Sequence, residues 1–140
     1  MRIGIKSGTF RILTPGHIWA LNYCAARCDY LIVLTNSDEY LLRKKGSCPI
    51  KLLDRLTILS SLKMIDEIGW FPEDTEDSWI ELFKYSEFTQ FPDPKKLIVF
   101  HSIETQNKEY IPAKHLADEI IYVPRVEGST TKIIEDLKNG

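Results

Sequence analysis

Short apolar runs rich in β-branched residues alternate along this chain with segments of helical periodicity. The runs are RIGIKS (2–7), YLIVLT (30–35), EIGWF (67–71), KLIVF (96–100) and EIIYV (119–123). Runs of this length and composition are typical of buried strands. Because strands that alternate with helices form a parallel sheet covered on both faces, the sequence predicts an α/β protein with a Rossmann-like, doubly wound parallel sheet of about five strands.

Apolar residues at helical spacing predict the helices between these strands. The first helix face carries Ile18, Leu21, Ala25 and Cys28, and the second carries Leu52, Leu56 and Leu59 with Lys63 at its edge. Capping residues predict further helices that begin near Thr75, Pro112 and Ser129. Ligands of such sheets bind at the carboxyl ends of the strands. We interpret the segments there as loops: 7–17, 36–51, 72–75, 101–111 and 124–129.

The length and charge of the chain bound its function. Its 140 residues, 44% of them hydrophobic, suit a single domain that spans residues 1–140. With 18 basic and 20 acidic residues the formal net charge is −2, which provides no field to attract a nucleic acid or a membrane surface. No apolar run is long enough to span a bilayer, and the first residues enter a strand without a signal-peptide pattern, so we expect a cytoplasmic protein.

The three cysteines do not predict a disulfide framework or a metal site. Cys24 and Cys28 are one helical turn apart, but a metal would need two more ligands that the neighbouring sequence lacks. We interpret both as small apolar side chains on a helix face and predict no metal site built from protein ligands.

The segment SGTFRILTPGH (7–17) is typical of a loop that binds an anion at the start of a helix. Gly8 follows the first strand, where the backbone must turn, and Gly16 and His17 open the next helix. Free N–H groups and the helix dipole favour an anion there, and His17 can donate a hydrogen bond to a phosphate oxygen. Taken alone, His17 can equally be a helix cap or a surface residue.

The segment RVEGSTTKI (125–133) predicts a second anion site. Gly128 precedes Ser129, Thr130 and Thr131 at a helix start, and Arg125 lies three residues before the glycine. Hydroxyl and N–H groups would converge there, although an ordinary helix cap beside an exposed arginine is the alternative. Both helix starts follow strands of a parallel sheet and would face the same crevice, an arrangement that suits a triphosphate.

The segment LLRKKGSC (41–48) lies between these two sites in the sequence. Its cations Arg43, Lys44 and Lys45 precede Gly46, whose backbone permits movement. They would extend toward the phosphates, or they form a solvated surface, as most runs of charge do.

These segments resemble the motifs of the cytidylyltransferase-like nucleotidyltransferases. The first family motif, G-x-F-D-x-x-(H/T)-x-G-H, is similar to GTFRILTPGH (8–17), and RVEGSTTKI resembles the last motif. NSDEY (36–40), Arg55 and MIDEI (64–68) resemble family segments between them. The similarity runs nearly end to end and is strongest to the glycerol-3-phosphate cytidylyltransferases and the heptose-phosphate nucleotidyltransferase domains.

The resemblance implies transfer of a nucleoside monophosphate from a triphosphate to a phosphorylated acceptor, with release of pyrophosphate. It implies that His17 donates to the phosphates in the transition state, Lys44 closes over the triphosphate, and Arg125 supports the leaving group or the acceptor phosphate. The implied nucleotide- and phosphate-binding residues are Gly8, Thr9, Phe10, Thr14, Gly16, Gly128, Ser129, Thr130 and Thr131. The implied acceptor-binding or supporting residues are Arg11, Asp38, Arg55, Asp66 and His101. It also implies Mg²⁺, bound chiefly through the phosphates, and a homodimer.

Three residues depart from the family pattern. Arg11 stands where the motif has an aspartate, and would either bind phosphate or point to solvent. Thr14 replaces the first histidine of the cytidylyl members, as in many adenylyltransferases. His101 falls in the altered segment FHSIETQNKEY (100–110), where it is either a new contact or an exposed loop residue.

Three functions follow from this pattern. We expect CTP as the donor, because RVEGSTTKI resembles the cytidylyl members, and glycerol 3-phosphate or a sugar phosphate as the acceptor. Transfer from ATP is the enzymatic alternative, which Thr14 favours. A nucleotide-binding homologue without catalysis remains open, on account of Arg11 and the segment around His101.

Overall fold

The computed structural model describes residues 1–72, 96–108, 111, 114–126 and 130–139, of which 130–134 are described by their backbone alone. The elements are β1 (Arg2–Gly8), α1 (Pro15–Ala25), β2 (Tyr30–Asn36), α2 (Asp38–Lys45), α3 (Leu52–Ser60), β3 (Glu67–Phe71), β4 (Lys96–Ser102), the 3-10 helix η1 (Ile103–Thr105), β5 (Glu119–Val123) and α5 (Thr130–Asn139).

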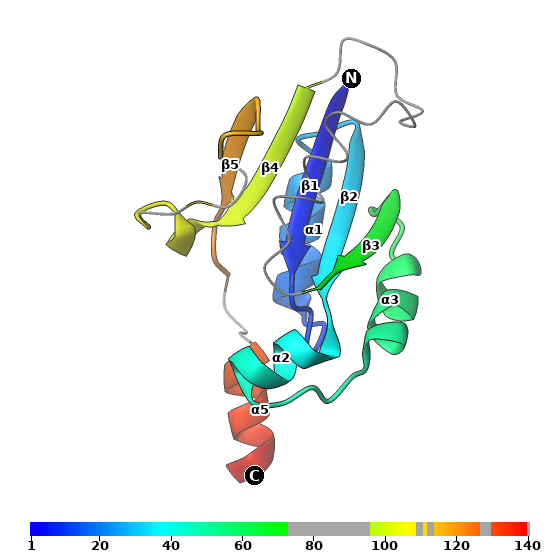
Figure 1. Cartoon of the computed structure of the whole chain (residues 1–140), viewed down its shortest axis with the longest axis vertical. Coiled ribbons are helices and arrows are strands. Elements are labelled where there is room, and N and C mark those ends of the chain that lie inside the picture. The colour runs from blue at the N-terminus through cyan, green and yellow to red at the C-terminus, as the bar shows by residue number, and fades with distance from the viewer. Residues whose placement is uncertain (73–95, 109–110, 112–113, 127–129, 140) are drawn as a thin grey trace.

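The five predicted strands form one parallel sheet in the order β3-β2-β1-β4-β5, which confirms the predicted fold class (Figure 1). β1, β2 and β4 extend one or two residues beyond their predicted carboxyl ends. The chain builds β1, β2 and β3 toward one edge and then returns to place β4 on the other side of β1. The strand order therefore reverses between β1 and β4, where open α/β sheets form their ligand crevice.

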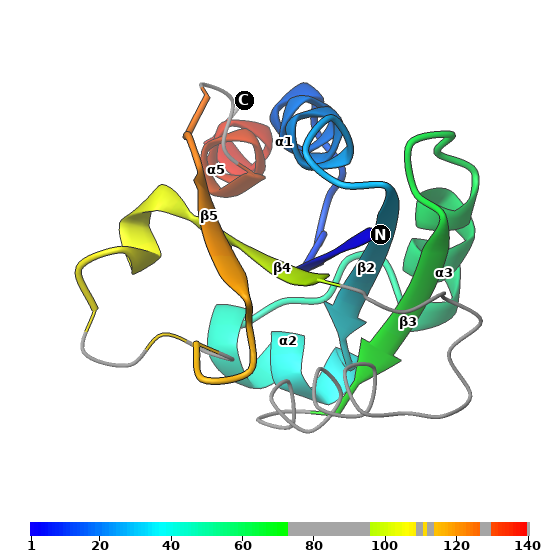
Figure 2. The same ribbon diagram turned by 90° about the horizontal axis from the view of Figure 1, so that it is seen from above.

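The central strands β1, β2 and β4 carry buried residues on both faces, which explains why they are continuous apolar runs rather than alternating ones. One face carries Ile3, Ile5, Ile32, Leu34, Leu97 and Val99. The other carries Leu31, Val33, Ile98 and Phe100, packed with Leu21 and Cys24 of α1 and Leu59 of α3. Figure 2 shows α1 and α5 on one side of the sheet and α2 on the other. Figure 1 shows α2 and α5 at the carboxyl end of the strands.

Three aspartates hold the amino ends of the strands in register. Each one accepts a hydrogen bond from the N–H of a residue on the neighbouring strand and donates its own N–H to the carbonyl of that same residue. The pairs are Asp29 with Arg2, Asp66 with Leu31 and Asp118 with Leu97, with carboxylate distances of 2.7, 2.8 and 2.7 Å. A slip of one residue in the pairing of two strands would move every apolar side chain to the opposite face of the sheet. These reciprocal pairs therefore fix the strand register at the amino end of the sheet.

The helix α2 corrects the prediction of a loop over 36–51. Ser37 caps its start by accepting from the Tyr40 N–H at 3.2 Å, and Gly46 ends it in the left-handed conformation, with φ of 77°. Only Leu41 is buried among its eight residues, so the hydrophobic periodicity that predicted the other helices is missing here. The capping residues were the available signal.

The remaining helix predictions differ in outcome. α1 and α3 are confirmed, but α1 ends before Cys28 and α3 ends before Lys63. α5 is confirmed over 130–139, and η1 replaces part of the predicted loop 101–111. The helix starts predicted at Thr75, Pro112 and Ser129 lie outside the described residues. In the described part of the chain, no helix combines the length and the apolar character that crossing a membrane requires.

The cysteines behave as buried apolar groups. Cys24 is fully buried in the core, and Cys28 packs against the same cluster. Burial raises the pKa of Cys24 to about 12 and that of Cys28 to about 11, so both are neutral thiols at physiological pH.

Substitution of Asp66 tests whether this residue contributes to the stability of the sheet without contributing to ligand binding. Asp66→Ala leaves the N–H of buried Leu31 without its acceptor, so we expect a loss of about 1–3 kcal/mol in the free energy of unfolding. Asp66→Asn keeps a side-chain oxygen and should lose less. Urea titrations of both variants measure these losses. Because Asp66 lies at the amino end of the sheet, ligand affinity at the carboxyl end should be unchanged, and a weakened affinity in the folded variant would contradict this assignment.

Candidate phosphate-binding site

A cavity of about 280 Å³ opens where the strand order reverses. Its walls come from the end of β1, the loop that follows, the start of α1, η1 and the segment after β5. It brings together these residues predicted from the sequence: Gly8, Thr9, Phe10, Thr14, Gly16, His17 and Arg125. Its volume is slightly below the range of about 300–1,000 Å³ that is usual for small-molecule pockets.

Thr14 and His17 cap the start of α1 by bonding to each other. The Thr14 N–H donates to Nδ1 of His17 at 3.1 Å, and the His17 N–H donates to Oγ1 of Thr14 at 3.4 Å. This is a capping box in which histidine occupies the position usually held by glutamate or glutamine. Pro15 follows as the first helical residue, where it needs no N–H partner. Local helix chemistry therefore explains both Thr14 and the placement of His17.

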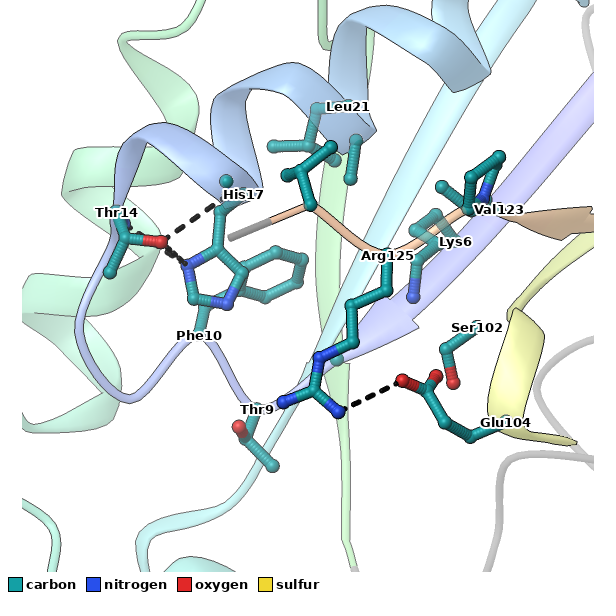
Figure 3. Close-up of a pocket in the computed structure, with 15 residues that line it drawn as sticks. Lys6, Thr9, Phe10, Thr14, His17, Leu21, Ser102, Glu104, Val123 and Arg125 are labelled. Carbon is teal, nitrogen blue, oxygen red and sulfur yellow. Dashed lines mark hydrogen bonds and ion pairs between the residues drawn. The ribbon is translucent and has the colours of Figure 1, made fainter. Parts of the chain in front are cut away.

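The capping box also determines which nitrogen of His17 carries the proton. A backbone N–H can only donate, so Nδ1 must accept from Thr14, and the proton of the neutral ring lies on Nε2. Figure 3 shows the His17 ring beside Thr14 and Phe10 at the cavity. The Thr14 N–H engages Nδ1, and the Ile12 carbonyl also interacts with the ring.

The surroundings of His17 favour its neutral form. Burial lowers the pKa of the ring below its ordinary value of 6.5, and the positive charge of Lys6 lowers it further. The Ile12 carbonyl acts in the opposite direction, because it stabilises the protonated ring. At neutral pH His17 is therefore an uncharged hydrogen-bond donor at the positive end of a helix dipole.

The backbone at Phe10 is unusual, with φ of 46° in a region that non-glycine residues rarely adopt. Its buried ring lies 5.5 Å from the His17 ring, measured between centroids. A Cβ on Gly8 would come within 3.0 Å of the Phe10 ring, so the glycine gives this ring its room. Backbone strain of this kind is common at ligand-binding loops.

Lys6 and Glu104 also line the cavity, and the sequence did not predict them. Alternation along β1 places Lys6 on the same face as Gly4 and Gly8, and this was the one signal available for it. Glu104 of η1 pairs with Arg125 at 3.2 Å, with both side chains about half exposed. Lys6, His17 and Arg125 extend toward one space from three separate elements (Figure 3). Among the described residues that line the cavity, Glu104 is the one with a carboxylate side chain.

A buried arginine supports the cavity from behind. Arg55 is 1% exposed and donates to the Thr9 carbonyl at 3.0 Å, to Oγ1 of Thr35 at 2.8 Å and to Asp38 at 2.9 Å. Burial alone would raise the pKa of Asp38, but hydrogen bonds from Cys48, Arg55 and the Leu52 N–H lower it. Arg55 and Asp38 are thus engaged with each other and with the loop that forms the cavity wall.

Several candidate residues lie away from the cavity. Asp66 pairs at the opposite end of the sheet. His101 is 7% exposed within β4, on the face away from Phe100 and α1, so it is not the exposed loop residue that was one interpretation. Lys44 is exposed in the last turn of α2 and is absent from the cavity lining. Gly128 and Ser129 lie outside the described residues, and the side chains of Thr130 and Thr131 are not described.

Arg11 is neither exposed nor in the cavity. It is 8% exposed, and its guanidinium donates to Oγ of Ser47 at 3.1 Å and to the Lys45 carbonyl at 3.4 Å. The prediction of a solvent-exposed side chain is therefore wrong, and direct phosphate binding by Arg11, which does not line the cavity, stays a prediction.

The sequence of the chain is similar to part of the HldE proteins. No family model matches the chain. It is 32% identical over 143 residues to the bifunctional protein HldE of Rhodopseudomonas palustris (strain BisA53), which covers 99% of this chain and 27% of that protein. It is 34% identical over 140 residues to bifunctional protein HldE of Marinomonas sp. (strain MWYL1), covering 96% and 27%. The chain thus spans about a quarter of the length of the curated relatives it matches.

Solved structures share its fold. The lipopolysaccharide core biosynthesis protein of Thermoplasma volcanium superposes with a TM-score of 0.66 at 22% identity, covering 89% of this chain and 98% of that one. A bifunctional NMN adenylyltransferase/ADP ribose pyrophosphatase from Francisella tularensis gives 0.66 at 14% identity, covering 99% and 42%. The chain therefore shares the fold of these two proteins. This fold and the similarity to HldE proteins agree with the resemblance of the motifs to the cytidylyltransferase-like nucleotidyltransferases. Within that class it is a homologue of one segment of the HldE proteins.

The pKa of His17 predicts a specific pH dependence of stability. Because folding lowers this pKa below 6.5, the unfolded chain binds the proton first on acidification. His17 therefore contributes stability that is fully present above about pH 6.5 and is lost as the pH falls through the folded-state pKa. The free energy of unfolding should fall more steeply between about pH 7 and pH 5 in the wild type than in His17→Gln. Equal slopes in parallel urea titrations would show that His17 is not buried in its neutral form.

Proposed function

We propose that the protein is a nucleotidyltransferase that transfers a nucleoside monophosphate from a nucleoside triphosphate to the phosphate of a small acceptor. The observation that carries this proposal is the placement of His17 at the cavity by the capping box of α1, where burial and Lys6 favour its neutral form. Lys6 and Arg125 add positive charge to the same cavity. The similarity to HldE proteins and the shared fold support the same class of reaction.

The proposed reaction needs positioning and neutralisation of charge rather than a protein nucleophile. An oxygen of the acceptor phosphate attacks the α-phosphorus of the triphosphate in line, and the bond from that phosphorus to the bridging oxygen of the β-phosphate breaks. Pyrophosphate leaves with the electron pair. Nε2–H of His17 donates to the phosphate oxygens on which charge builds, and the N-terminus of α1 favours the same anion.

The donor and the acceptor are the finer part of the proposal. We propose CTP as the donor and glycerol 3-phosphate or a sugar phosphate as the acceptor, from the resemblance of RVEGSTTKI to the cytidylyl members. ATP is the alternative, supported by Thr14 and by the adenylyltransferase among the structures that share the fold. A non-catalytic homologue is the other alternative. Arg11, one of the two features that motivated it, lies outside the cavity lining, and the altered segment around His101 still supports it.

Further roles stay predictions from the resemblance. Lys44 would close over the triphosphate, and the hydroxyls of Ser129, Thr130 and Thr131 would hold its β- and γ-phosphates. Among the described residues no group of three or more histidine, cysteine, aspartate or glutamate side chains could hold a metal. We therefore propose that Mg²⁺ enters with the triphosphate, bound through its phosphates, where it would neutralise their charge. A homodimer is likewise a prediction, which light scattering would test.

Two substitutions of His17 separate catalysis from folding. Glutamate suits this position of a capping box and the helix dipole, so His17→Glu should keep the unfolding free energy of the wild type while placing an anion in the cavity. His17→Ala removes the acceptor of the Thr14 N–H but leaves Thr14 as the N-cap, and should cost about 0.5–1.5 kcal/mol of stability. Both should lower pyrophosphate release at least about 100-fold, since both remove a transition-state donor.

The measurement is pyrophosphate release with CTP or ATP, Mg²⁺ and a panel of acceptors that includes glycerol 3-phosphate and sugar 1-phosphates. Release with one triphosphate and one acceptor, lost in both His17 variants, is the expected result. Triphosphate binding without release from any acceptor would favour the non-catalytic homologue. Full activity of His17→Glu would contradict the role proposed for Nε2–H.

A further inference from the structure

Arg11 belongs to the loop that forms the cavity, yet its side chain leaves the cavity. Its neighbours Phe10 and Thr14 line the cavity, and Arg11 does not. Its guanidinium instead reaches the end of α2, where Nη1 donates to Ser47 and to the Lys45 carbonyl. With 8% of its surface exposed, Arg11 is a largely buried cation whose hydrogen bonds go to the turn that follows α2.

The end of α2 is an environment suited to a cation. Helix C-termini leave carbonyls without intrahelical partners and carry partial negative charge. α2 ends at Lys45, and Gly46 turns the chain in the left-handed conformation. A carboxylate at position 11 would meet the Lys45 carbonyl and the negative end of the helix dipole. The guanidinium of Arg11 meets the same groups as a donor.

Both ends of α2 are bonded to this one loop. At its start, Asp38 pairs with Arg55, which also donates to the Thr9 carbonyl. At its end, the Lys45 carbonyl accepts from Arg11. Two guanidinium groups therefore fix α2 against the segment from Thr9 to Arg11.

The last turn of α2 carries three exposed cations, Arg43, Lys44 and Lys45, called here the cationic turn. It lies at the carboxyl end of the sheet, as the cavity does (Figure 1). Charges on such a turn act on a bound polyanion over about 10 Å at moderate ionic strength, so their effect depends on where the turn is held.

We propose that Arg11 is a positioning residue that holds the cationic turn beside the phosphate-binding loop, so that these cations add to the affinity for a polyphosphate. This inference rests on the proposed function, because it requires that the cavity binds a triphosphate. Arg11 acts through the turn and does not contact the phosphates itself.

A double-mutant cycle tests this coupling on the full chain. The variants are Arg11→Gln, Lys44→Ala with Lys45→Ala, and the combination of all three, each titrated with CTP, ATP and inorganic tripolyphosphate by calorimetry. Arg11→Gln and the lysine pair should each weaken binding about tenfold, and the combination should weaken it no more than the lysine pair alone. The proposal would be overturned if the triple variant raised the dissociation constant by the product of the two separate effects. It would also be overturned if Arg11→Gln left the dissociation constant unchanged.

Further variants distinguish positioning from charge and from folding. Arg11→Lys keeps a donor and a cation beside the helix end and should recover part of the affinity. Ser47→Ala removes the partner at 3.1 Å without changing charge and should weaken binding in the same direction as Arg11→Gln. Lys63→Gln removes an exposed cation just before β3, at the amino end of the sheet, and should leave affinity unchanged. A loss of thermal stability in Ser47→Ala and Arg11→Lys with no change in affinity would reduce Arg11 to a structural role.

A wild type that binds none of the three polyphosphates would instead refute the proposed function.

Discussion

The guanidinium of Arg55 is the interaction on which the carboxyl edge of the sheet depends. It joins the residue after β1, the end of β2, the start of α2 and the Ile50 carbonyl before α3, all within 3.0 Å. Loss of one hydrogen bond to a charged group of this kind costs about 1.5–3 kcal/mol, a sizeable part of the stability of a domain this size. Because one of its acceptors is Thr9, the same group that stabilises the edge also fixes the first residue of the cavity loop. Stability and site geometry therefore share one side chain here.

From this anchored loop, the chemistry of the cavity follows from backbone geometry. The cap of α1 requires an acceptor for the Thr14 N–H, and His17 supplies Nδ1. That bond leaves the proton on Nε2, while burial and Lys6 keep the ring neutral. A helix-capping interaction thereby produces an oriented, uncharged donor at the positive end of a helix, which is suited to an oxygen on which negative charge develops.

The sheet could be predicted from the sequence because its strands are buried on both faces and are separated by helices of clear periodicity. The cavity residues of the first loop could be predicted from their motif. α2 could not be predicted from hydrophobicity, since it buries Leu41 alone, and only Ser37 and Gly46 mark its ends. The burial of Arg11 and Arg55 could not be predicted, because their partners lie between 5 and 46 residues away in the chain. Lys6 could not be predicted as a cavity residue from a motif, because a lysine inside a strand belongs to none. Alternation along β1 was the available signal, since it places Lys6 on the face of the sheet that α1 covers.

The most direct test of this account is the protonation pattern of the His17 ring. A long-range ¹H–¹⁵N correlation spectrum at neutral pH distinguishes a protonated ring nitrogen from one that accepts, and comparison with His17→Gln assigns the signals. The account predicts a neutral ring with a protonated Nε2 and an accepting Nδ1, with the Nε2 signal shifting when a triphosphate is added. A proton on Nδ1, or a doubly protonated ring at neutral pH, would contradict it.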